Sequence, residues 1–176
     1  MGRPAVFLDK DGTLVENVPY NVDPARVRLA AGAGAALRRL RAAGYRLVVV
    51  TNQSGVARGY HSEDDVQRVA DHLGMVLAAL GAPLAGFYYC PHLACAGRKP
   101  APGMVRRAGA ELDVDLARSW LVGDILDDVE AGARAGCRTV LVQNGGETEW
   151  RRGPFRHPTA VVPDLSAAAE FILSSP

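Results

Sequence analysis

Two carboxylates stand two residues apart in the segment Asp9-Lys10-Asp11-Gly12-Thr13, directly after a short apolar run. With this spacing, one carboxylate can attack an electrophile while its neighbour transfers a proton. Two negative charges so close together also need a cation, and hard oxygen ligands favour Mg²⁺. The pattern therefore predicts a nucleophile, an acid–base group and a magnesium site. Acidic residues after a strand are equally common as loop residues or helix caps, so the segment by itself leaves both interpretations open.

Later segments supply groups that suit a phosphate oxyanion. Asp124 and Asp128 add acidity, Thr51 offers a hydroxyl followed by backbone N–H donors, and Lys99 offers a point charge. Only two of the 20 basic residues are lysines, Lys10 and Lys99, and both lie inside the segments that carry this chemistry. Together these residues predict a site that binds and transfers a phosphoryl group.

Short apolar runs alternate with amphipathic segments along the chain, and this alternation predicts the elements that position those groups. The apolar runs are continuous, which indicates a mostly parallel sheet with helices on both faces, a doubly wound α/β fold. Ligands bind beyond the carboxyl ends of such strands, so we expect the polar segments to converge at one edge of the sheet. The predicted strands are residues 5–8, 45–50, 87–89, 120–122, 139–142 and 160–162, and the predicted helices are 32–43, 63–80, 102–112, 127–135 and 166–173.

Four motifs occur in a fixed order: Phe-Leu-Asp-Lys-Asp-Gly-Thr, Thr-Asn-Gln-Ser-Gly, Arg-Lys-Pro-x-Pro-Gly-Met and Gly-Asp-x-x-x-Asp. In this order they resemble the haloacid dehalogenase superfamily. More closely, the chain is similar to its capless branch of histidinol-phosphate phosphatases and D-glycero-D-manno-heptose 1,7-bisphosphate phosphatases. The similarity runs from about residue 5 to residue 144. It implies a haloacid dehalogenase-like Rossmannoid fold without a separate cap domain, with residues 1–176 forming a single phosphatase domain.

The resemblance also implies a role for each motif residue. Asp9 would be the nucleophile that forms an aspartyl-phosphate, and Asp11 would protonate the leaving alcohol and then activate water. Mg²⁺ would be held by the Asp9 carboxylate, the Asp11 backbone carbonyl and Asp124. Thr51 and Lys99 would stabilise the transferring phosphoryl group.

Other positions resemble residues that contact substrate or support the site. Asp128 would orient neighbouring groups rather than touch the metal directly. Ile125 stands where relatives that prefer heptose bisphosphate often carry a lysine. The substrate-contacting positions implied by the resemblance are Asn17, Tyr20, Asn52, Gln53, Ser54 and Arg98.

A second set of residues, in the loop 90–98, is typical of zinc sites. Thiolate and imidazole ligands favour tetrahedral Zn²⁺, and the resembling enzymes hold it with Cys-x-His and, after a longer insert, Cys-x-Cys. Here Cys90, His92 and Cys95 match, but Gly97 replaces the fourth ligand and the insert is shorter. Two interpretations stay open: a structural zinc held by three ligands, or a loop with two free cysteines. Cys137, between a helix and a strand, is expected in the core.

The leading functional prediction is a magnesium-dependent phosphatase acting on a small sugar phosphate, with D-glycero-D-manno-heptose 1,7-bisphosphate first. Histidinol phosphate is the alternative substrate, and a polynucleotide 3′-phosphatase is a further enzyme hypothesis. A phosphoacceptor receiver domain is the non-enzyme alternative, which Asp11 disfavours because a receiver needs no proton donor beside its phosphoacceptor.

Composition limits the partners. The 176 residues are 48% hydrophobic and carry a net charge of +1, which predicts no affinity for nucleic acid or an anionic membrane. No apolar stretch approaches the ~20 residues needed to span a bilayer, and an odd number of cysteines, three, suits a reducing compartment. We therefore expect a soluble, cytoplasmic monomer whose partner is a small phosphorylated metabolite.

Overall fold

Six parallel strands form a single sheet in the computed structural model of the chain, which describes residues 2–175. The order in space is β3-β2-β1-β4-β5-β6, so the direction of winding reverses between β1 and β4. Ligands of open α/β sheets bind in the crevice at such a reversal, beyond the carboxyl ends of the strands. The strands are β1 (Ala5–Leu8), β2 (Arg46–Asn52), β3 (Gly86–Cys90), β4 (Trp120–Gly123), β5 (Arg138–Val142) and β6 (Ala160–Val162).

The register brings the polar strand ends level with one another. Leu8 of β1 pairs with Val49 of β2 and with Val122 of β4. The Asp9 N–H then donates to the Val122 carbonyl at 2.9 Å, so Asp9 leaves the sheet between its two neighbouring strands. The segments that follow β1, β2 and β4 therefore start side by side.

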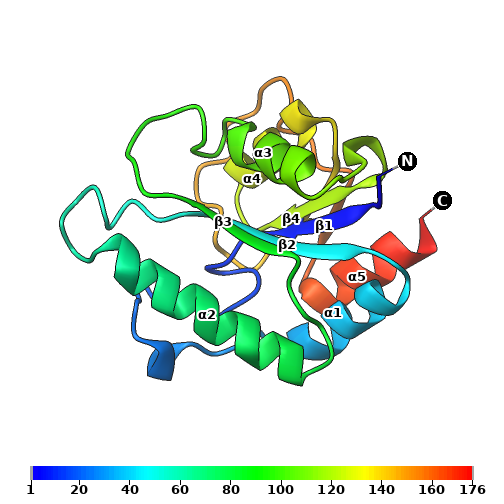
Figure 1. Cartoon of the computed structure of the whole chain (residues 1–176). Coiled ribbons are helices and arrows are strands. Elements are labelled where there is room, and N and C mark those ends of the chain that lie inside the picture. The colour runs from blue at the N-terminus through cyan, green and yellow to red at the C-terminus, as the bar shows by residue number, and fades with distance from the viewer. Residues whose placement is uncertain (1, 176) are drawn as a thin grey trace.

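Helices cover both faces of the sheet, which confirms the predicted doubly wound architecture (Figure 1). Val6 and Leu8 pack in the core on one face of the sheet, whereas Ala5 and Phe7 pack in the core on the other. Because both faces of the sheet are buried at these residues, the strand that they form is apolar at every position. The first face carries α1 (Ala33–Ala42), α2 (Glu63–Ala79) and α5 (Leu165–Ser174); the second carries α3 (Gly103–Glu111) and α4 (Leu126–Ala135).

Two helix ends carry local capping signals. Ser62 caps α2: its hydroxyl accepts the Asp65 N–H at 3.2 Å, and the Asp65 carboxylate accepts the Ser62 N–H at 2.7 Å. Gly44 follows α1 with φ +94°, a conformation that stops a helix at little cost for glycine. Two short 3₁₀ turns, Pro24–Arg26 and Leu116–Arg118, were not predicted, since three residues are too few to give a periodic pattern.

Among the described residues, no separate cap domain interrupts the sheet. The connection from β1 to β2 holds one 3₁₀ turn and α1, and that from β2 to β3 holds α2. Neither connection inserts a separate domain over the carboxyl ends of the central strands. Within residues 2–175, no helix is both long and apolar enough to cross a membrane.

Candidate active site

The polar segments converge as predicted, at the carboxyl ends of β1, β2 and β4. A pocket of about 210 Å³ opens there. All four motifs contribute to it, together with Gly146 from a fifth segment, so the first, second, third and fourth motifs surround one space. The lining residues are Asp9, Asp11, Asn17, Thr51, Asn52, Lys99, Asp124, Ile125 and Gly146.

Three buried carboxylates lie close together, and two of them, Asp9 and Asp124, line this pocket. Asp9, Asp124 and Asp128 each offer an oxygen, and these oxygens lie within 4.8 Å of one another. Burial raises the pKa of Asp124 to about 7, and the charges of Asp9 and Asp128 push it in the same direction. A divalent cation would relieve this repulsion, and a set of hard oxygen donors suits Mg²⁺. The residues therefore fit the predicted metal.

Two glycines allow the backbone to approach the Asp124 carboxylate closely. A Cβ at Gly12, whose φ is +86°, would lie 2.2 Å from one Asp124 oxygen. A Cβ at Gly146 would lie 2.1 Å from the same oxygen. Any side chain at either position would displace Asp124, so both glycines shape the acidic site.

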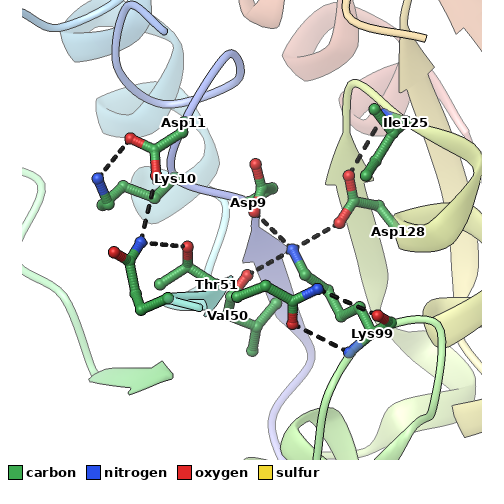
Figure 2. A network of polar contacts seen from close by, with 10 residues as sticks. Asp9, Lys10, Asp11, Val50, Thr51, Lys99, Ile125 and Asp128 are labelled. Atoms are coloured by element: carbon green, nitrogen blue, oxygen red, sulfur yellow. Dashed lines mark hydrogen bonds and ion pairs between the residues drawn. The ribbon is translucent and has the colours of Figure 1, made fainter. Parts of the chain in front are cut away.

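Lys99 is a buried cation in contact with the nucleophile position, Asp9. Its ammonium forms ion pairs with Asp9 and Asp128 and donates to the Val50 carbonyl at 2.9 Å (Figure 2). Burial alone would lower the pKa of Lys99, but the carboxylates of Asp128 and Asp9 outweigh it and raise the pKa. Lys99 therefore stays charged beside Asp9.

The Asp128 carboxylate makes contacts that the motif spacing did not predict. Its carboxylate joins the three-carboxylate group, pairs with Lys99 and accepts the Ile125 N–H at 3.3 Å. Burial raises the pKa of Asp128, against the opposing pull of Lys99. Its contact with Lys99 agrees with an orienting role, and its oxygen also lies near those of Asp9 and Asp124.

Asn52, predicted to contact substrate, forms two hydrogen bonds with the backbone of Lys99. Its amide group donates to the Lys99 carbonyl at 3.0 Å, and its oxygen accepts the Lys99 N–H at 3.0 Å. Asn52 thus fixes the backbone from which the Lys99 side chain enters the site. Motif spacing gave no signal for this contact, because 47 residues separate the two partners.

Asp11 is held by two neighbours. The Lys10 ammonium pairs with its carboxylate, and the Gln53 amide donates to it at 3.2 Å and to the Thr51 hydroxyl at 3.0 Å (Figure 2). Burial raises the pKa of Asp11, whereas Lys10 lowers it. The Lys10 side chain is only 4% exposed, so it is part of the site. Sequence reasoning gave it no role, and its rarity as a lysine was the only signal.

Comparison with known proteins agrees with this geometry. A family described as HAD-hydrolase-like matches residues 96–168. A D-glycero-D-manno-heptose-1,7-bisphosphate 7-phosphatase of Thermosynechococcus vestitus is 40% identical over 98% of this chain and 96% of its own length. The enzyme named D-glycero-beta-D-manno-heptose-1,7-bisphosphate 7-phosphatase of Haemophilus ducreyi is 43% identical over 82% of this chain and 86% of its own. The chain belongs to the heptose-bisphosphate phosphatases of the haloacid dehalogenase-like superfamily.

A solved structure supports the same placement. The D,D-heptose 1,7-bisphosphate phosphatase of B. bronchiseptica, solved with magnesium and phosphate, superposes with a TM-score of 0.85. It is 37% identical, and the match covers 97% of this chain and 98% of that one. The heptose-bisphosphate phosphatase fold, without a cap domain, therefore extends over almost the whole chain.

The remaining positions predicted to contact substrate lie at different distances from the pocket of this chain. Asn17 lines the pocket, whereas Tyr20, Ser54 and Arg98 lie outside its lining. Tyr20 is half exposed and packs edge-to-face on Tyr60, with ring centroids 4.9 Å apart. Arg98 donates from its guanidinium to the His92 carbonyl at 3.3 Å, so it also supports the cysteine loop.

The zinc residues expected from the family do not form a zinc-type cluster. Within residues 2–175, the only group of three candidate ligands is Asp9, Asp124 and Asp128. Cys90 is buried, His92 and Cys95 are exposed, and the two sulfurs lie 2.9 Å apart. Cys137 is buried in the core, as predicted, and burial raises its pKa to about 12.

Proposed function

We propose that this protein is a magnesium-dependent phosphatase that removes the 7-phosphate of D-glycero-D-manno-heptose 1,7-bisphosphate. The observation that carries the proposal is the Asp9 carboxylate, which lies close to Asp124 and pairs with the Lys99 ammonium, with Asp11 two residues further on in the same pocket. The names of the relatives that match nearly the whole chain support the same substrate.

The first chemical step uses Asp9 and Asp11. An Asp9 oxygen attacks the phosphorus of the 7-phosphate, the bond to the sugar oxygen breaks, and Asp11 donates a proton to that oxygen. The product is a free sugar hydroxyl and an aspartyl-phosphate at Asp9. The raised pKa of Asp11, which follows from its burial, suits a group that starts the reaction protonated.

The second step returns Asp9 to its free form. Asp11, now ionised, takes a proton from water as the water oxygen attacks phosphorus, and inorganic phosphate leaves. The Lys99 ammonium and the Thr51 hydroxyl oppose the charge on the phosphoryl oxygens in both steps. Asp9, Asp124 and the Asp11 carbonyl would hold Mg²⁺, which when bound neutralises charge on the carboxylates and the phosphoryl group.

The setting of the enzyme is also part of the proposal. Residues 1–176 would act as one catalytic domain and as a monomer in the cytoplasm, on a small phosphorylated sugar. The three free cysteines agree with a reducing compartment.

A panel of phosphate esters tests this assignment. Phosphate release would be measured for both anomers of the heptose bisphosphate, for histidinol phosphate and for a 3′-phosphorylated oligonucleotide. We expect the highest kcat/KM for a heptose bisphosphate. A higher kcat/KM for histidinol phosphate or for the oligonucleotide would show that the assigned substrate is wrong. Stable phosphorylation of the protein without turnover would indicate a receiver domain instead.

The metal is tested in the same assay. EDTA should stop phosphate release from heptose bisphosphate, and Mg²⁺ added without zinc should restore it. The Asp9→Asn protein, assayed alongside, controls for contaminating phosphatases. Full restoration by Zn²⁺ with no effect of Mg²⁺ would show that the metal is assigned to the wrong site.

A further inference from the structure

The two cysteines of the loop 90–98 are held against each other. Their sulfurs lie 2.9 Å apart, and the Cys90 sulfur also lies 3.9 Å from the His92 carbonyl oxygen. Both are free thiols in the structure. Cys90 is only 3% exposed, whereas Cys95 is open to solvent. One sulfur of the pair is therefore accessible to a reagent, and the other lies directly behind it.

The backbone on both sides fixes this arrangement. The Cys90 carbonyl accepts the Gln53 N–H at 2.8 Å, at the end of β3. The Cys95 carbonyl accepts the Arg98 N–H at 3.1 Å, and the Ala96 carbonyl accepts the Gly103 N–H at 3.1 Å. Since each end of the loop is tied to ordered structure, the two sulfurs meet without a large rearrangement of the chain.

The same residues are poorly arranged for zinc. Two thiolates bound at ~2.3 Å to one tetrahedral zinc lie roughly 3.8 Å apart, well beyond the observed separation. The position of the missing ligand is occupied by Gly97, where a Cβ would lie 3.6 Å from the Cys95 sulfur. A side chain there would approach that sulfur, but glycine offers no ligand. The loop therefore has two thiols typical of a zinc site but lacks the fourth ligand that would complete it.

We propose that Cys90 and Cys95 are a reversible thiol–disulfide pair that a hydroperoxide oxidises. The exposed Cys95 sulfur attacks the O–O bond, forming a sulfenic acid as water or an alcohol leaves. The Cys90 sulfur then attacks the Cys95 sulfur, the S–O bond breaks, and the Cys90 proton leaves with the hydroxyl as water. The two thiols are oxidised to one disulfide and the hydroperoxide is reduced. An exposed cysteine beside a resolving partner is the arrangement found in redox-sensitive cysteine pairs.

The bridge would act on the residues that follow it. It closes a ring over residues 90–95, and Arg98 binds that ring through its N–H to Cys95 and its guanidinium to His92. Oxidation therefore fixes the loop that carries Arg98, whereas Lys99 is held separately by Asn52.

Thiol mapping of the intact protein tests the proposal. The reduced full-length chain would be treated with hydrogen peroxide, the remaining thiols alkylated, and the peptides identified by mass spectrometry. We expect Cys90 and Cys95 in one intramolecular disulfide that dithiothreitol reverses, with buried Cys137 alkylated only after unfolding. Recovery of Cys95 as an alkylated thiol, or in disulfides between two chains, would overturn the proposal.

Two variants separate the roles of the sulfurs. In Cys90→Ala the exposed Cys95 should stop at the sulfenic acid, which a dimedone-type reagent traps, because no resolving thiol remains. In Cys95→Ser the buried Cys90 should stay a thiol under the same treatment. Cys95→Ser changes an exposed side chain, so its fold is expected to survive. Equal oxidation of Cys90 with and without Cys95 would contradict the order of attack.

A zinc titration tests the competing interpretation directly. After zinc is added to the reduced wild-type chain, a chelator should remove the zinc, and hydrogen peroxide should still produce the disulfide. Gly97→Cys, which supplies a fourth ligand beside Cys95, should retain one zinc per chain and resist peroxide. Tight, stoichiometric zinc in the wild type that protects both thiols would overturn the proposal.

Discussion

Asp9 depends on the charges around it. Its carboxylate is buried beside Asp124 and Asp128, and the Lys99 ammonium is the cation in contact with it. An attacking carboxylate must approach a phosphate dianion, and the paired lysine reduces the repulsion between the two. The residues at the pocket base therefore act as one electrostatic unit.

Replacing Asp9 tests the role of the nucleophile in this group of charged residues. Asp9→Asn should abolish phosphate release and leave the thermal unfolding transition in place, because an amide neither attacks phosphorus nor binds Mg²⁺ as a carboxylate does. Asp11→Asn should lower kcat by ~10²- to 10⁴-fold, the usual contribution of acid–base catalysis. Steady-state phosphate release and circular dichroism would measure both. Normal activity in Asp9→Asn would remove the mechanism.

Lys10 should act through Asp11. Lys10→Met removes the ammonium that orients the Asp11 carboxylate, so kcat should fall, by less than the ~10²- to 10⁴-fold expected on losing the acid–base group itself, with KM little changed. Lys10→Arg keeps a cation and should recover most of the loss. A purely structural role would instead lower the unfolding temperature and leave the activity of the folded protein intact.

Lys99 and Arg98 should divide the work between chemistry and recognition. Lys99→Ala should lower kcat for every phosphate ester, because charge stabilisation in the transition state is lost. Arg98→Ala should mainly raise KM, most strongly for substrates with a second anion, since its planar guanidinium can bind two oxygens. Equal loss of kcat from both variants, across all esters, would contradict this division.

Among the elements, the sheet was the most predictable part. A parallel strand buried on both faces must be apolar throughout, so runs such as residues 5–8 and 120–122 stand out, and the convergence of Asp9, Thr51 and Asp124 follows. Asn52, predicted to contact substrate, lines the pocket, and its hydrogen bonds to the Lys99 backbone were not predicted. Such contacts depend on which loops lie close together after folding, and the spacing of residues along the chain does not show this.

Two glycines with similar backbone conformations, Gly12 in the turn after β1 and Gly44 after α1, form a matched pair for substitution. Gly12→Ala places a Cβ at φ +86° against Asp124, whereas Gly44→Ala places one at φ +94° with no atom within 4 Å. In both variants, the strain of a left-handed alanine should lower the free energy of unfolding by about 1–2 kcal/mol. Only Gly12→Ala should also weaken Mg²⁺ binding and lower kcat.

Denaturant unfolding and magnesium titration of the two glycine variants give the comparison. Intact Mg²⁺ affinity in Gly12→Ala, with a loss of stability equal to that of Gly44→Ala, would show that this turn does not shape the metal site.

For the molecule as a whole, the buried acidic site couples stability to pH and metal. The pKa of Asp124 is raised from 3.8 to about 7, so the folded state holds this proton more tightly than the unfolded chain does. Its contribution to stability is therefore complete below its ordinary pKa and is lost as the pH rises through about 7. Mg²⁺ must displace that proton, so binding should strengthen with pH up to the same value.

Thermal unfolding with and without Mg²⁺ measures this coupling. Below the raised pKa of Asp124, the apparent Mg²⁺ affinity should fall by about tenfold per pH unit. The increase in unfolding temperature that Mg²⁺ produces should therefore be larger near pH 8 than near pH 5, a window set by that pKa. A larger increase at the lower pH would contradict the assignment of Asp124 as a ligand.

The most direct test of the central claim follows both phosphates of one substrate. Phosphorus NMR of D-glycero-D-manno-heptose 1,7-bisphosphate, with enzyme and Mg²⁺, distinguishes the 1-phosphate, the 7-phosphate and inorganic phosphate. We predict that the 7-phosphate signal disappears as inorganic phosphate appears, while the 1-phosphate stays attached, and that Asp9→Asn leaves both signals unchanged. Release of the 1-phosphate first, or no release by an enzyme that hydrolyses histidinol phosphate under the same conditions, would contradict the account.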